Sequence, residues 1–301
     1  MRKTLYIIVI LLTILTTLSL FIKPTVSFTA VNPPPPPPSA PIQKATKDDL
    51  KKIKNIGEKF TGEKFVYKVG FWLFKEVAAG SIGLERGEDG TYIATLEAHT
   101  TGFIDRRFVH REDVYTATLK LVDGGKRFMT TRFEKNILID DKTKRTLTVV
   151  DYEKGVIIKK AWKGKRLRKS SELEIPKDVV YDDPLAAFYN FRYGAYGPIK
   201  KGGKYSILTF PKESKPEIKI GIWIAPDTDF KKYTKRKDSR ARYFSKFHID
   251  KELFDSKRGI IEILFNEDLV PLIVVAKDIL MFGDVVGTLL ELDSGDFEKY
   301  L

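Results

Sequence analysis

The stretch FVYKVGFW at residues 65–72 places apolar side chains at alternate positions and is dense in aromatic and β-branched residues. This period of two is typical of a β-strand with one buried face. The pattern returns along the chain, and turn signals such as Glu88-Asp89-Gly90 and Asp123-Gly124-Gly125 separate its copies. It predicts further strands at residues 92–98, 114–122, 128–136, 145–151, 156–163, 204–210, 218–224, 241–248, 260–265, 272–276 and 283–292.

One helix interrupts these strands at residues 183–192, DPLAAFYNFR. Asp is a favoured N-cap and Pro fits the first helical position, while Gly194 can end the helix. At helical spacing one face carries Leu185, Phe188, Tyr189 and Arg192. Because the helix is short and very apolar, we predict a mainly β fold in which a curved antiparallel sheet, or a partly closed β-barrel, wraps around it.

The N-terminus predicts export. Arg2 and Lys3 precede a charge-free stretch at residues 4–22, which as a helix would span roughly the hydrocarbon core of a bilayer. A cleaved signal peptide would use a small-residue site such as Thr25-Val26-Ser27, whereas the length of the stretch favours an uncleaved anchor. We predict a cell-envelope protein, either anchored in the inner membrane with its domain in the periplasm or secreted to the periplasm.

Six consecutive prolines at residues 33–38 follow the apolar stretch. Proline fixes φ and donates no backbone hydrogen bond, so this run predicts a stiff polyproline II spacer. We divide the chain into a signal anchor or signal peptide (1–27), a proline-rich linker (28–45), a β-rich exported domain (46–292) and a tail (293–301). A short helix at residues 46–56, ended by Gly57, would open the domain.

Composition excludes several classes of protein. The chain has 301 residues and no cysteine, which removes disulfides, thiolate metal sites and cysteine nucleophiles. At 43% hydrophobic and 31% charged residues it is too apolar for a disordered chain and too polar for a multi-span membrane protein. A single glutamine (Gln43), beside abundant Lys and Glu, is typical of a thermophile.

The net charge of +13 is concentrated in two basic runs, at residues 159–169 and 231–242. Such runs can bind nucleic acid, but export removes the protein from nucleic acids. We therefore weigh two interpretations, a solvated surface and a contact with an anionic membrane surface. The contact would be made by Lys163, Lys165, Arg166, Arg168, Lys235, Arg236, Lys237 and Arg240.

Motifs for catalysis are absent from the sequence. His99, His110 and His248 have no metal-ligand spacing, and there is no G-x-S-x-G or phosphate-binding glycine loop. Helix capping and turn formation explain the carboxylate pairs Asp182/Asp183 and Asp140/Asp141. We predict no catalytic residue, cofactor or metal, and we do not favour an enzyme.

Arg192 is the most informative polar residue, because it closes the apolar face of a helix that should be buried. A buried arginine needs carboxylate or carbonyl partners. It either forms a structural ion pair, with Asp183, Glu63 or Asp268, or clamps an anionic headgroup inside the sheet. In the second case Arg192, Tyr189 and Asp183 would form the binding site.

Three motifs in order carry a family resemblance. They are Gly62-Glu63 with Tyr67 and Gly80, the helix at residues 183–192, and EDLVPLI at 267–273 followed by Gly283. Over residues 58–292 the chain resembles an uncharacterised bacterial envelope family, catalogued as domain of unknown function thirty-one oh eight. It departs from that family at Ala186, where serine is common, and in an apparent insertion at 231–242. The resemblance implies a secreted or periplasmic β-rich domain. It implies no particular activity, because none is established for the family.

Two functions remain open from the sequence, with a hydrolase as a third and less favoured one. The first is binding, either of an apolar or amphipathic envelope molecule in the concave side of the sheet or of a partner protein. A fold-level likeness to the half-barrel lipoprotein carriers agrees with this. The second is a structural stand-off adaptor tethered to the inner membrane. An apolar cavity would favour binding, and an exposed apolar patch over a filled core would favour the adaptor.

Overall fold

A computed structural model describes residues 55–71, 74–234, 238–251, 256–279 and 283–290. Two meanders of antiparallel strands make up most of this part. The first meander contains β1 (Lys64–Phe71), β2 (Phe74–Arg86), β3 (Tyr92–Thr100), β4 (Arg111–Val122), β5 (Arg127–Ile139), β6 (Lys142–Asp151), β7 (Val156–Lys163) and β8 (Arg166–Glu174). The second contains β9 (Lys204–Thr209), β10 (Ile218–Ile224), β11 (Tyr243–His248), β12 (Ile260–Phe265), β13 (Pro271–Ile279) and β14 (Gly283–Leu289).

The two meanders join into one sheet through the pair β1–β14. The order of the fourteen strands is β8-β7-β6-β5-β4-β3-β2-β1-β14-β13-β12-β11-β10-β9, and every pairing is antiparallel. The predicted mainly β, antiparallel class is therefore confirmed. Within the described residues β8 and β9 are the two edges of the sheet.

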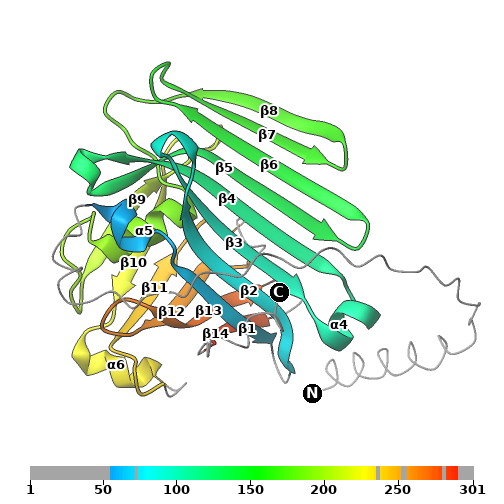
Figure 1. Cartoon of the computed structure of the whole chain (residues 1–301), viewed down its shortest axis with the longest axis vertical. Helices are drawn as coiled ribbons and strands as arrows, with labels where there is room; N and C mark the ends of the chain where they lie inside the picture. The colour runs from blue at the N-terminus through cyan, green and yellow to red at the C-terminus, as the bar shows by residue number, and fades with distance from the viewer. Residues whose placement is uncertain (1–54, 72–73, 235–237, 252–255, 280–282, 291–301) are drawn as a thin grey trace, which may run out of the picture. The chain divides into compact units, whose positions relative to one another are not determined.

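The predicted central helix is α5 (Pro184–Tyr193). Its N-cap, Asp183, accepts hydrogen bonds from the backbone N–H groups of Leu185 and Ala186, and Gly194 ends it in the left-handed conformation at φ 86°. One side of α5 packs in a cluster with β1–β5, and the other side, through Phe191, packs with β9–β12. The helix therefore lies between the two meanders (Figure 1).

Most predicted strands are confirmed to within a few residues, but β2 and β8 were not predicted from the sequence. β2 contains Ala78, Ala79, Gly80 and Gly83, which are weak strand formers and hide the alternation. β8 is an edge strand whose residues are nearly all exposed, so it needs no apolar face. The turn signals form the short 3₁₀ turns η2 (Glu88–Gly90) and η3 (Asp123–Gly125).

The helix prediction near the start of the domain is partly wrong. Residues 46–54 lie outside the described part, and the described helix α3 (Ile56–Phe60) begins after the N-cap Asn55. Gly57, predicted to end a helix, lies inside α3. It packs against the ring of Tyr92, where a Cβ would not fit. Two further short helices, α4 (Gly102–Arg107) and α6 (Asp227–Tyr233), were not predicted.

The predicted anchor, proline-rich linker and tail all lie outside the described residues. In the part of the chain that the structure does describe, no helix combines the length and apolar character needed to cross a membrane.

Candidate functional site

An apolar space lies between the two meanders, beside α5. It has a volume of about 270 Å³, and a second space of about 180 Å³ continues it. Val69, Ala98, Ala276 and Val285 line both, so we treat them as one apolar groove. Its walls carry Val69 and Leu96 from the first meander, Ile220, Phe247 and Ile263 from the second, and Phe188 from α5.

Small side chains in aligned positions leave this groove open. Gly80 on β2 lies directly across from Ala98 on β3, and Val69 on β1 lies across from Gly287 on β14. A Cβ at Gly80 would lie 3.1 Å from the carbonyl oxygen of Glu97. Because protein interiors are normally close-packed, an unfilled apolar groove forfeits contacts that an apolar ligand would restore.

A more polar space of about 260 Å³ adjoins the groove and shares Pro184, Ile220 and Ile249 with it. We call it the basic end. Three lysines and one carboxylate line it: Lys135 on β5, Lys159 on β7, and Lys212 and Asp250 on the second meander's side. The basic end is therefore a region of excess positive charge that adjoins the apolar groove.

Lys159 is a partly buried lysine of the basic end. Its ammonium donates a hydrogen bond to the carbonyl of Pro211 and lies 5.8 Å from the ring centroid of Phe210. Burial, followed by repulsion from Lys212 and Lys169, lowers the pKa of Lys159 to about 8. The other two lysines are held by neighbours: Lys212 pairs with Asp250 at 2.7 Å, and the ammonium of Lys135 lies 4.9 Å from the ring centroid of Tyr115.

Arg192 lies outside the groove lining. Its guanidinium binds Glu63 through Nη1–Oε2 at 2.5 Å and Nη2–Oε1 at 2.8 Å, and Nε donates to the carbonyl of Leu269 at 2.8 Å. Glu63 is thus the partner among the three carboxylates weighed from the sequence. Arg192 is only 4% exposed and stacks on the ring of Phe60 at 4.6 Å. This geometry fastens α5 to the start of β1 and to the loop before β13.

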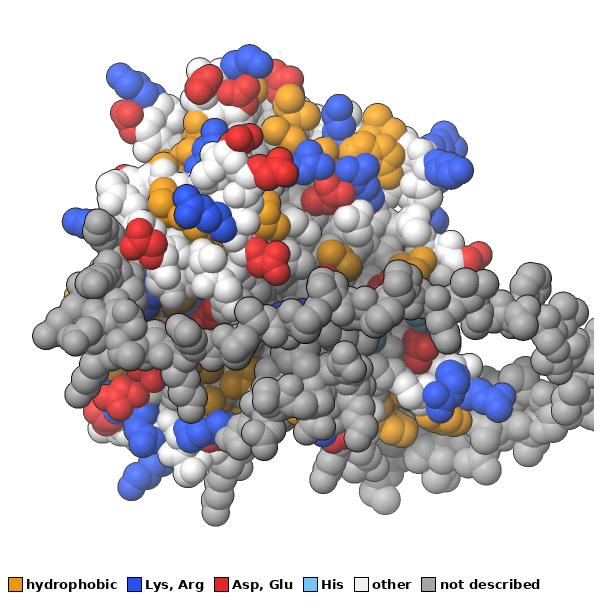
Figure 2. Space-filling view, viewed as in Figure 1, with side chains coloured by type: hydrophobic (Ala, Val, Ile, Leu, Met, Phe, Trp, Pro, Cys, Tyr) orange, Lys and Arg blue, Asp and Glu red, His pale blue; other side chains and the backbone are white. Residues whose placement is uncertain are grey.

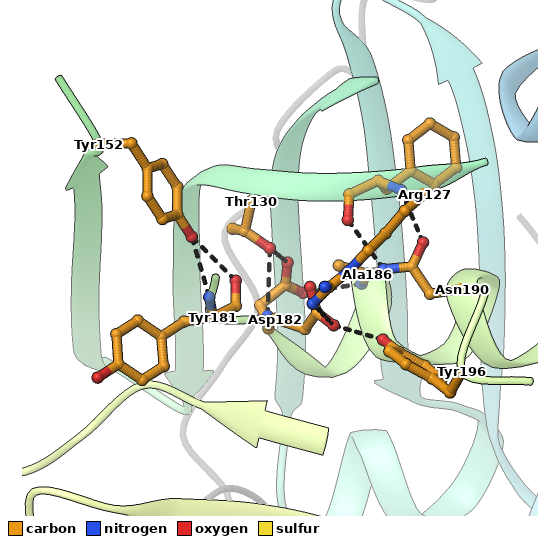
Figure 3. Close-up of polar contacts among 10 residues, drawn as sticks. Arg127, Thr130, Tyr152, Tyr181, Asp182, Ala186, Asn190 and Tyr196 are labelled. Carbon is orange, nitrogen blue, oxygen red and sulfur yellow. Dashed lines mark hydrogen bonds and ion pairs between the residues drawn. The ribbon is translucent and has the colours of Figure 1, made fainter. Parts of the chain in front are cut away.

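Asp182, Asp183 and their neighbours form a buried polar cluster at the start of α5. Figure 3 labels Asp182 with Arg127, Thr130 and Asn190 in this cluster. Thr130 donates to Asp183 Oδ2 at 2.6 Å, and burial raises the pKa of Asp183 to about 7. Arg127 Nη2 lies 2.9 Å from Asp182 Oδ2, and Asn190 exchanges two hydrogen bonds with the backbone of Phe128. Both carboxylates are 0% exposed, so neither presents a surface to a substrate, and the cluster ties α5 to β5.

Tyr189, the third residue of the predicted binding site, is fully buried and packs against Phe60 and Phe128. Arg192, Tyr189 and Asp183 therefore belong to the core beside the groove rather than to its lining. Among the described residues no group of three His, Asp or Glu side chains could hold a metal ion.

The first basic run lies on the hairpin of the sheet's edge. Lys163 ends β7, Lys165 is in the turn, and Arg166 and Arg168 are on β8, all exposed. Charged side chains on an edge strand prevent another strand from adding to it, which accounts for this run structurally. Figure 2 shows positive and negative side chains interspersed over the visible face.

The second basic run is described only in part, because Lys235, Arg236 and Lys237 lie outside the described residues. Arg240 forms an ion pair with Asp238 at 2.8 Å, within the same run.

Two exposed aromatic side chains, which the sequence analysis did not single out, lie on α4 and at its C-cap. Phe103 is 59% and Phe108 is 53% exposed, and their rings meet edge to face at 5.2 Å. Arg106 and Arg107 beside them are also exposed. Ile104, on the buried side of α4, lines the smaller part of the groove, so the exposed pair lies near one end of it.

The fold and site define the class of protein: a mainly antiparallel β protein with an apolar groove between two meanders and a basic end. No protein-family profile and no curated protein matches the chain. Among solved structures it is similar to the crystal structure of a beta-barrel-like protein of domain of unknown function DUF1849 from Brucella abortus. The two share 14% identity with a TM-score of 0.42, over 76% of this chain and 96% of that chain.

Proposed function

We propose that the protein binds an apolar or amphipathic molecule of the cell envelope in the apolar groove and performs no chemistry on it. The observation that carries this proposal is the lining, which is mostly apolar on the side of both meanders and of α5, with Ser81 and Glu97 among its few polar residues. Ligand sites typically have volumes of about 300–1,000 Å³ and mostly apolar walls. The larger part of the groove, at about 270 Å³ with its continuation beside it, is close to that range.

The proposal includes the setting inferred from the sequence. Residues 1–27 would anchor or export the chain, and the prolines at 33–38 would hold the domain away from the inner membrane. The placement of α5 between two meanders agrees with a partly closed β-barrel, as in the half-barrel carriers of apolar ligands. Likeness of fold alone does not establish function, so the groove carries the argument.

Filling the groove should remove the ligand. We expect lipid extracted from the purified full chain to be identifiable by mass spectrometry, and Ala98→Trp to lower its amount by about tenfold or more, since Ala98 lines both parts of the groove. The matched control is Thr95→Trp on the same strand, whose side chain points to the other face. Lipid held by the N-terminal segment would be present in both variants, so the difference between them reports the groove alone.

Equal amounts of lipid in Ala98→Trp and Thr95→Trp would contradict binding in the groove. A second blocking variant, Ala276→Trp on the facing meander, guards against a local folding defect at β3, because it fills the same space from the opposite wall.

The exposed aromatic pair on α4 favours a second candidate function, a structural adaptor that rests on an anionic lipid surface. Phe103 and Phe108 would enter the interface, and Arg106 and Arg107 would pair with lipid phosphates. Exposed apolar side chains next to basic ones match the chemistry of such a surface.

A single fluorescent label can test this contact, because the chain contains no cysteine. An environment-sensitive fluorophore on Phe103→Cys should shift to the blue when the full chain is reconstituted in anionic vesicles, but not in zwitterionic ones. Glu88→Cys, exposed at the other end of β3, should not respond. A response from Arg168→Cys instead would assign the contact to the edge hairpin and contradict the role of α4.

A further inference from the structure

The basic end is built by neighbouring strands of the first meander. In register across β5, β6 and β7, one row contains Phe133, Thr148 and Lys159, and the next row brings Lys135 opposite Thr146. All five residues line the basic end. The register therefore places two ammonium groups and two hydroxyl groups on one wall, all of them able to donate hydrogen bonds to an anion.

The opposite wall closes the basic end without neutralising it. Lys212 and Asp250 stand there as an ion pair. Within the described residues no carboxylate lies at ion-pair distance from the ammonium of Lys159, whose hydrogen-bond partner is the neutral carbonyl of Pro211. Asp250 and Glu213 act on Lys159 only from beyond ion-pair distance, and burial outweighs them. A half-buried ammonium without a directly paired carboxylate is costly, and a bound anion would reduce that cost.

The basic end continues directly into the apolar groove. Pro184 at the start of α5, with Ile220 and Ile249, lines both spaces. Tyr115 lines the groove with its ring while the ammonium of Lys135 lies over that ring. A molecule with one charged end and one apolar tail could therefore occupy the two spaces together.

We propose that the ligand is an anionic amphiphile, with its apolar chain in the groove and its carboxylate or phosphate bound by Lys159, Lys135 and the hydroxyl groups of Thr146 and Thr148. This inference rests on the proposed function and adds the charge of the ligand and the place of its head. A neutral lipid would bring no negative charge to Lys159, whose hydrogen-bond partner in the protein is the neutral carbonyl of Pro211. The lowered pKa of Lys159 has the same origin, burial next to Lys212 and Lys169.

The test compares ligands that differ only in the head. The full chain, reconstituted in lipid nanodiscs, is labelled with a photoreactive fatty acid, and oleate, oleoyl lysophosphatidate and oleyl alcohol compete for the labelled groove peptides. Lys159→Met should weaken competition by the anionic ligands by about tenfold or more, the loss of one charge-assisted hydrogen bond. Competition by oleyl alcohol should change less than about twofold.

Lys160→Met is the matched control, because Lys160 is the next residue on β7 and is exposed on the other face. The Lys160→Met variant should leave competition by all three ligands unchanged. Comparing the two variants also cancels differences in how the ligands partition into the nanodisc. Lys159→Arg should restore competition by the anionic ligands. If Lys159→Met is poorly folded by circular dichroism, Lys135→Met replaces it, with the same expected loss of selectivity.

The outcomes separate this inference from the proposed function. One outcome is that the groove is labelled but Lys159→Met weakens competition by oleate and by oleyl alcohol equally, or weakens neither. This outcome would overturn the head site and leave the groove as an apolar binding site. No labelling of groove peptides in the wild type would overturn both. A loss for oleoyl lysophosphatidate alone would assign a phosphate head, and a loss for oleate alone a carboxylate head.

Discussion

Replacing Arg192 by methionine is expected to lower the free energy of unfolding by about 3–5 kcal/mol, the usual cost of breaking a buried ion pair by removing one partner. The variant leaves Glu63 without its bidentate partner and the carbonyl of Leu269 without its donor. It also removes the guanidinium that stacks on Phe60 and Phe65. Denaturation by urea, followed by circular dichroism, measures the loss.

Arg132→Met is the control for this prediction, since the side chain of Arg132 is 45% exposed and its partner Glu134 keeps a second ion pair, with Arg145. Exposed pairs contribute about 0–1 kcal/mol, so this variant should be close to wild type. A small effect of Arg192→Met on stability, together with a large loss of photolabelling in the groove, would contradict the structural role and restore the headgroup clamp considered from the sequence.

The second large expected effect is a dependence of the free energy of unfolding on pH, which the variant Asp183→Asn is designed to measure. In the folded protein burial raises the pKa of Asp183 from its ordinary 3.8 to about 7. Between these values the folded state keeps a proton that the unfolded state has lost. The stability contributed by the protonated carboxyl is therefore fully present below about pH 4 and is lost as the pH rises to about 7.

Asparagine keeps the capping oxygen of Asp183 and can donate to Thr130, but it does not ionise. We expect the stability of Asp183→Asn relative to wild type to rise by up to about 4 kcal/mol between pH 4 and pH 7, from a shift of about three pKa units. Urea denaturation across this range measures the difference. A difference that is independent of pH would contradict an ionisable, buried Asp183.

Asp151→Asn provides a control of opposite sign. Hydrogen bonds from the Lys154 backbone and side chain lower the pKa of Asp151, whose side chain is 32% exposed. The wild-type stability contributed by Asp151 is therefore present above its ordinary pKa and is lost on acidification. The Asp151→Asn variant should lose a small amount of stability relative to wild type as the pH rises.

Local patterns predicted much of the fold because a half-buried strand and a capped helix each show themselves within a few neighbouring residues. The strands predicted at residues 218–224 and 260–265 have the same bounds as β10 and β12, and Asp183-Pro184 predicted the start of α5. β2 was missed because residues such as Gly80 lack the side chains that mark a strand. Gly80 lines the groove and lies close to the backbone of β3, where a Cβ would be 3.1 Å from the carbonyl oxygen of Glu97.

The candidate site could not be predicted in this way because it depends on contacts between distant parts of the chain. Glu63 and Arg192 are 129 residues apart, and the sequence offered three equivalent partners. Charge counting grouped Lys159 with the whole basic run at residues 159–169. Successive side chains of a strand point to opposite faces, so Lys159 lines the basic end whereas Lys160 is exposed to solvent.

The sequence by itself determined the period of two, the turns between strands, the caps of α5 and the position of the basic runs, because each depends on neighbouring residues. Only the tertiary structure decided that β1 pairs with β14 and that α5 lies between two meanders. It also decided which small residues align to leave a groove and which lysines meet at its end. These features follow from register and from long-range packing, which no short stretch of sequence encodes.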